Sequence, residues 1–95
     1  MKLEVIIADQ SLNFIRRQSP AAQKRLRAAV HKLERGETFP VPLTDELDGF
    51  YKMSVANCRL ILKHEAGGSA PLFKVVFAER RGVVYEMFRL VLNLE

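Results

Sequence analysis

The chain has 95 residues, of which 48% are hydrophobic, and a formal net charge of +4. This is the length of one small domain, and the apolar fraction is too high for intrinsic disorder. No apolar stretch approaches the ~18 residues that a membrane span needs, and the N-terminus lacks the layout of a signal peptide. The single Cys58 cannot form an internal disulfide. We therefore expect one soluble domain, residues 1–95, located in the cytoplasm and without a membrane partner.

The charges are unevenly distributed along the chain. Residues 37–48 contain four acids and no base, whereas residues 10–35 contain one acid and seven bases: Arg16, Arg17, Lys24, Arg25, Arg27, Lys32 and Arg35. Such a positive segment suits nucleic acid or an acidic protein partner, although a solvated helix surface would have the same composition. From this segment we select Arg16, Arg17 and Lys24 as candidate nucleic-acid contacts.

The first two elements are predicted to be a strand and a short helix. Residues 2–8 have β-branched side chains at their centre, which favours a strand. Asp9 or Ser11 then offers an N-cap for a helix over residues 10–18.

A second helix and an extended connector follow. Ser19-Pro20 is a typical helix start, and apolar residues at helical spacing continue until Gly36, which we expect to end the helix in a left-handed conformation. The connector over residues 37–49 contains two prolines that exclude a helix, and we expect Leu43 and Leu47 to anchor it to the core.

Three strands are predicted in the second half, over residues 50–55, 58–65 and 71–78. The turns between them are marked by Asn57 and by Gly67-Gly68-Ser69. A turn centred on Ala56-Asn57 pairs residue 54 with 59 and residue 52 with 61. This register places one set of side chains on an exposed cationic face: Lys52, Ser54, Arg59, Ile61 and Lys63. It places an apolar set on the core face, under the two helices: Tyr51, Met53, Val55, Cys58, Leu60 and Leu62.

The last strand is predicted to continue the core through an apolar row and to lead into a terminal helix. The row is Phe73, Val75 and Phe77, with Lys74 pointing the other way. Residues 83–92 are predicted to form the helix. Tyr85 would lie in its first turn, close to Arg80 and Arg81.

Several kinds of chemistry find no support in these residues. There is no glycine-rich phosphate loop, no Cys/His cluster and no pair of carboxylates on one strand face. His31 lies on a basic helix face and His64 at a strand end, so we expect neither to bind metal. Ser54 and His64 fall on opposite sheet faces, which argues against a serine nucleophile. We expect no metal and no cofactor.

The remaining candidates are cations and a phenol: Lys52, Arg59, Lys63, Arg80, Arg81 and Tyr85. RNA cleavage through its own 2′-hydroxyl needs alignment, charge neutralisation at the phosphate and transfer of two protons. Arginine grips phosphate oxygens with a planar fork, and lysine or tyrosine can hold charge or transfer protons beside other cations. The same residue types would also be found on any solvated strand face.

Three segments in order resemble the RelE/ParE superfamily of toxins from type II toxin–antitoxin systems. They are Leu47-Asp48-Gly49-Phe50-Tyr51-Lys52-Met53, Cys58-Arg59-Leu60-Ile61-Leu62 and Arg80-Arg81-Gly82-Val83-Val84-Tyr85. The resemblance covers nearly the whole chain. It implies an α+β fold, with a small antiparallel or mixed sheet of about four strands under an N-terminal helical hairpin and a C-terminal helix.

The resemblance also implies a function. A toxin of this superfamily is neutralised by a cognate antitoxin, and the RelE branch cleaves mRNA in the ribosome. Carried over residue by residue, the catalytic set is Lys52, Arg59, Arg81 and Tyr85. Ser54 and Glu79 stand where RelE-type enzymes often have cations, and Cys58 stands where an aromatic residue is usual. An alternative is therefore a ParE-like, non-enzymatic toxin that inhibits DNA gyrase, and a plain RNA- or partner-binding module is a third reading.

Overall fold

The computed structural model describes residues 3–65 and 72–93. The turn predicted at Gly67-Gly68-Ser69 lies outside these residues. The elements in chain order are β1 (Glu4–Ile7), α1 (Asp9–Arg16), α2 (Pro20–Glu34), β2 (Val41–Pro42), the 3-10 helix η1 (Asp45–Leu47), β3 (Phe50–Val55), β4 (Cys58–Glu65), β5 (Leu72–Arg80) and α3 (Val84–Asn93). No helix in this part of the chain is long and apolar enough to cross a membrane.

The strands form one mixed sheet in the order β1-β5-β4-β3-β2. β1 is parallel to β5, and the other neighbours are antiparallel. The predicted α+β class is confirmed, but the estimate of about four strands was one too low. The additional strand, β2, has only two residues and includes Pro42, so it gives no strand signal in the sequence.

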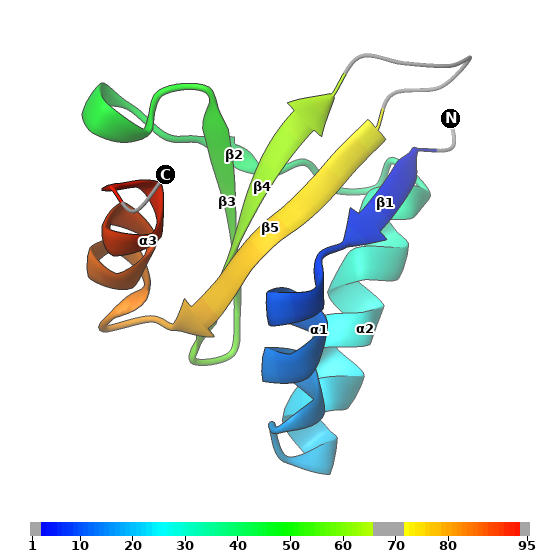
Figure 1. Cartoon of the computed structure of the whole chain (residues 1–95). Coiled ribbons are helices and arrows are strands. Elements are labelled where there is room, and N and C mark those ends of the chain that lie inside the picture. Colours follow the sequence, from blue (N-terminus) through cyan, green and yellow to red (C-terminus); the bar gives the residue numbers. More distant parts are fainter. Residues whose placement is uncertain (1–2, 66–71, 94–95) are drawn as a thin grey trace.

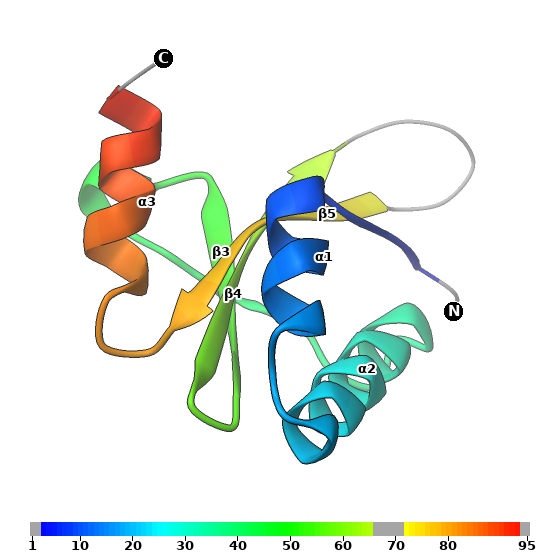
Figure 2. The same cartoon turned by 60° about the horizontal axis from the view of Figure 1, so that its bottom comes forward.

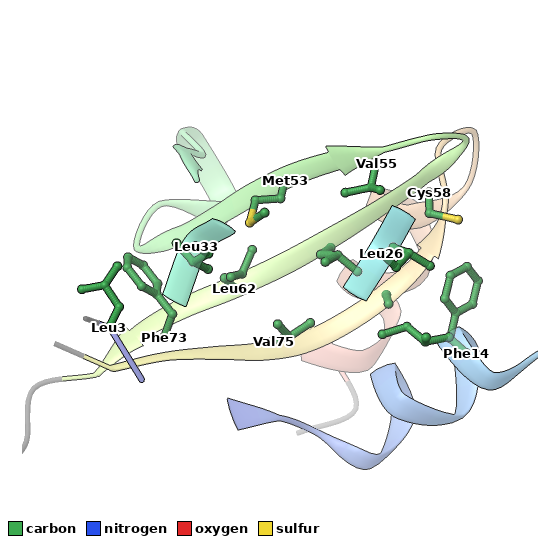
Figure 3. Packing of buried hydrophobic residues seen from close by; sticks show 13 residues of the cluster. Leu3, Phe14, Leu26, Leu33, Met53, Val55, Cys58, Leu62, Phe73 and Val75 are labelled. Atoms are coloured by element: carbon green, nitrogen blue, oxygen red, sulfur yellow. The ribbon is translucent and has the colours of Figure 1, made fainter. Parts of the chain in front are cut away.

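Helices cover the two faces of the sheet differently. Figures 1 and 2 show α1 and α2 on one side and α3 on the other. Leu26 and Leu33 of α2 are fully buried against the first face, where Figure 3 shows them among the side chains of the strands. Phe88 of α3 packs on the opposite face with Ile61 of β4. The sheet therefore has a hydrophobic cluster on each face.

The local signals at α2 act as predicted. The Ser19 hydroxyl accepts a hydrogen bond from the Ala22 N–H at 3.2 Å, and Pro20 occupies the first helical position. Gly36, with φ of 72°, takes the left-handed conformation after the last turn. These residues fix both ends of the helix that covers the first sheet face.

The start of α1 differs from the prediction. The N-cap is Ala8, without a side-chain cap, so neither Asp9 nor Ser11 has that role. Ser11 is instead buried, and its hydroxyl donates to the Val75 carbonyl at 3.3 Å. Gln10 donates to the Ala78 carbonyl at 2.7 Å and accepts from the Ala78 N–H at 2.8 Å. These side chains attach α1 to β5 at Val75, the last residue paired with β1, and beyond it at Ala78.

The predicted register of β3 and β4 is confirmed, with Ser54 opposite Arg59 and Lys52 opposite Ile61. The predicted core row on β5 was wrong for Phe77. A bulge opposite Ile61 and Leu62 shifts the alternation, so Phe77 lies in the cluster on the α3 side. Val75, before the bulge, remains in the cluster under α1 and α2.

Candidate functional site

Lys52 and Arg59 lie on the α3 side of the sheet, as their register with Ile61 and Ser54 requires. The prediction that this whole face is exposed was wrong. Ile61, at its centre, is completely buried in the cluster that α3 and η1 form over the face. The terminal helix is amphipathic and buries its apolar residues there, so only the polar parts of the face remain accessible. Lys52 and Arg59 are consequently half-buried.

Arg59 and Tyr85 form the central contact of the candidate site. The Arg59 Nη1 group donates to the Tyr85 hydroxyl across 3.4 Å, which joins β4 to the first turn of α3. Within the described residues, the buried Arg59 Nε has no hydrogen-bond partner. A buried donor without a partner costs free energy, which is more readily explained by a functional role of Arg59 than by a stabilising one.

A cavity of about 300 Å³ opens beside this contact. Tyr85 and Lys52 line it, together with Arg89 from the next turn of α3. The connector lines the rest of it through Leu43, Thr44, Asp45, Glu46 and Leu47. Leu47 is buried and Leu43 half-buried, which confirms that they anchor the connector to the core. The cavity thus combines two cations and a phenol with acidic residues of the connector.

The other sequence-predicted cations lie outside this cavity. Arg80 is exposed, and its Nε lies 4.0 Å from the neighbouring Glu79 carboxylate. Arg81 is exposed in the turn before α3, where its backbone N–H donates to the Asn57 carbonyl at 2.8 Å. Lys63 is exposed near the far end of β4, opposite Lys74 of β5. A catalytic role for Arg81 therefore stays a prediction.

The basic residues of the helical hairpin lie on the other side of the sheet. Arg16 ends α1, Arg17 follows it and Lys24 lies in α2; all three are exposed. Since α1 and α2 cover the first face, these cations are separated from Arg59 and Tyr85 by the sheet, as Figure 2 shows for the helices. They form a separate positive surface.

Arg89 is the residue at this site that the sequence patterns did not predict. It belongs to none of the segments that resemble known toxins. The available signal is its spacing, because residues i and i+4 of a helix lie on one face and Arg89 follows Tyr85 by four positions. Its Nε lies 3.3 Å from the Glu46 carboxylate of η1.

Cys58 does not contribute a nucleophile to this site. It is 4% exposed and belongs to the cluster under α1 and α2, as expected for a small apolar residue. Burial, and secondarily the charge of Glu79, raises the pKa of the Cys58 thiol. In the described part of the chain, no group of three or more His, Cys, Asp and Glu residues is positioned to hold a metal ion.

Comparison with known proteins relates this architecture to bacterial toxins. No protein-family model matches the sequence, and no curated protein matches it significantly. Among solved structures, a YoeB/ParE toxin from Agrobacterium tumefaciens matches with a TM-score of 0.63 and 15% identity, over 81% of this chain and 97% of that one. The RelBE2 toxin–antitoxin complex from Mycobacterium tuberculosis matches with a TM-score of 0.61 and 18% identity, over 85% and 100%. The expected RelE/ParE-like fold is thereby confirmed.

Proposed function

We propose that this protein is the toxin of a type II toxin–antitoxin system and that it cleaves ribosome-bound mRNA. The observation that carries the proposal is the contact of Arg59 with Tyr85 beside a cavity that Lys52 also lines. A guanidinium in contact with a phenol, and an ammonium that lines the cavity beside them, offer positive charge and a proton donor to a phosphodiester bound there. The fold similarity to the two toxin structures supports the same conclusion.

The proposed reaction uses the 2′-hydroxyl of the RNA as nucleophile. Its oxygen attacks the adjacent phosphorus as its proton passes to water, the bond to the 5′-oxygen breaks, and that oxygen receives a proton from the Tyr85 hydroxyl, which water then reprotonates. A 2′,3′-cyclic phosphate results. Arg59 and Lys52 neutralise the charge that grows on the phosphate, and Tyr85 transfers a proton beside these cations. Arg81 would contact RNA from the exposed turn before α3.

We further propose that a cognate antitoxin neutralises the protein. One of the similar structures is a toxin–antitoxin complex. The exposed cations of α1 and α2 would attract an acidic partner, and such a partner could also cover the cavity at Lys52. In either mode the antitoxin would occupy cationic groups of this protein that the ribosome and its mRNA would otherwise contact, and it would thereby block their binding.

Incubation of the pure protein with programmed ribosomes, followed by mapping of mRNA 5′ ends, tests the proposal. Cleavage within the message is expected, and it should be lost in Arg59→Ala. Arg27→Ala is a matched control, since it removes the same charge from the exposed surface of α2. Intact message at stoichiometric wild-type protein would contradict the enzymatic proposal.

One observation favours a second candidate, a non-enzymatic toxin that inhibits DNA gyrase. Glu79 is the register partner of Arg59 on β5, so a carboxylate is carried next to the proposed phosphate site. A negative charge there weakens anion binding. A supercoiling assay with gyrase separates the two candidates. Inhibition that persists in Tyr85→Phe and Arg59→Ala would favour binding over catalysis.

A further inference from the structure

Two cations line the cavity beside Tyr85, in addition to Arg59, which contacts Tyr85. Lys52 enters it from β3 and Arg89 from α3, so the two cations come from different elements and face one space of about 300 Å³. Tyr85 lines this space and also accepts the hydrogen bond from Arg59. The cavity is therefore continuous with the position proposed for the phosphodiester that is cleaved.

The side chain of Arg89 is accessible to a ligand. It is 46% exposed, and the Glu46 side chain that contacts it is 74% exposed. Solvent-exposed ion pairs contribute little to stability because water and salt screen them. An entering phosphate, which can accept two hydrogen bonds from a guanidinium, could replace the Glu46 carboxylate without disrupting the fold.

Glu46 lines the same cavity, at the middle of η1. Its carboxylate reaches the guanidinium that a phosphate would bind, and the two anions would compete for it. Hence Glu46 has an effect opposite in sign to that of Arg89: it lowers the affinity of the cavity for phosphate while contributing to the contact between η1 and α3.

We propose that Arg89 forms a subsite for a second phosphate of single-stranded RNA, next to the one at Lys52, Arg59 and Tyr85, and that Glu46 masks Arg89 until RNA displaces it. The inference rests on the proposed function and adds to it a binding residue and a competing acid. The ligand is the phosphodiester backbone, since Lys52 and Arg89 are charged donors suited to phosphate oxygens, whereas the carboxylates of Asp45 and Glu46 that line the same cavity oppose an anion.

The test measures binding of a 2′-O-methyl RNA oligonucleotide, which resists cleavage, to the 95-residue chain over a range of salt concentrations. Each phosphate contact contributes about 0.7 to the slope of log affinity against log salt for a single strand. Arg89→Ala should weaken binding several-fold at low salt and reduce the slope by about 0.7. Arg89→Lys should restore most of the slope, and Arg27→Ala is the charge-matched control on α2.

Glu46→Gln provides the decisive comparison. If Glu46 masks Arg89, this variant binds RNA several-fold more tightly, and the gain disappears in the Glu46→Gln/Arg89→Ala double variant. If the two residues only hold η1 against α3, both single variants loosen the same contact and weaken binding alike, which overturns the masking. Thermal melting of each variant verifies that folding is intact.

Lys52→Ala and Arg59→Ala distinguish failure of the subsite from failure of the proposed function. A slope that falls in these two variants but not in Arg89→Ala overturns the subsite and leaves the proposed function standing. A slope that none of the three variants changes overturns both, because the oligonucleotide then binds elsewhere on the protein.

Discussion

The Tyr85 hydroxyl accepts a hydrogen bond from the Arg59 guanidinium at 3.4 Å, although 26 positions of sequence separate the two residues. The contact depends on α3 packing over the sheet through Val84 and Phe88, which are buried beside Ile61. The hydrophobic cluster on this face therefore positions the polar groups above it. A substitution of Tyr85 should therefore change proton transfer at the site, whereas a substitution of Val84 or Phe88 should change the position of α3 on the sheet.

Tyr85→Phe should abolish most mRNA cleavage while leaving the fold intact. Removal of a general acid or base reduces rates by about 10²–10⁴-fold, and only the hydroxyl is lost in this variant. Single-turnover cleavage on programmed ribosomes measures the rate, and thermal melting measures stability. Binding to the ribosome should remain near the wild-type level. An unchanged cleavage rate would show that Tyr85 transfers no proton in the reaction.

Gln10→Ala should destabilise the protein by about 1–3 kcal/mol in urea unfolding, since the buried Ala78 N–H and carbonyl both lose their partner. The matched control is Gln23→Ala. That amide also bonds two backbone carbonyls, those of Arg16 and Gln18, but on the side of the helical hairpin and partly in solvent. A cost for Gln10→Ala no larger than that for Gln23→Ala would contradict the role given to Gln10, which is to pair the backbone of β5 beyond the end of β1.

The parts of the fold that local chemistry determines were predictable from the sequence. Ser19, Pro20 and Gly36 fix the ends of α2 through capping and backbone preferences, and each acts in the structure as expected. The register of β3 and β4 follows from side-chain alternation across a two-residue turn, which explains why Lys52 and Arg59 were placed on one face correctly.

Tertiary packing decided the features that were predicted wrongly or missed. The bulge in β5 places Phe77 on the α3 side of the sheet, and no residue pattern in a single sequence predicts such a bulge. Burial of Ile61 required knowledge of where α3 docks. Arg89 reaches the cavity for the same reason, because its contribution depends on α3 packing over this face of the sheet next to η1. The polar residues Lys52, Arg59 and Tyr85 were thus predictable from the sequence. The lining of the cavity by Arg89 and by the connector was not.

Leu26→Ala should reduce the free energy of unfolding by about 2–5 kcal/mol, because this fully buried side chain of α2 fills the centre of the cluster on the first face (Figure 3). Leu90→Ala is the matched control on α3, where Leu90 is 62% exposed. Its effect on stability should stay within about 0.5 kcal/mol. If Leu26→Ala and Leu90→Ala changed the free energy of unfolding in urea equally, the hydrophobic cluster between the sheet and helices α1 and α2 would not be the main core on that side.

Cys58 should react slowly with iodoacetamide at pH 8 in the folded protein and much faster in urea. Burial raises its pKa first, and the charge of Glu79 raises it further, so the folded state holds less of the reactive thiolate at this pH than the unfolded chain does. As the pH rises, the rate in the folded protein should increase at a higher pH than in the unfolded chain. Glu79→Gln removes the smaller contribution and should shift that increase slightly toward lower pH. Mass spectrometry of the alkylated protein over a pH series measures both profiles. Coincident profiles for folded and unfolded protein would show that Cys58 is solvated rather than packed under α1 and α2.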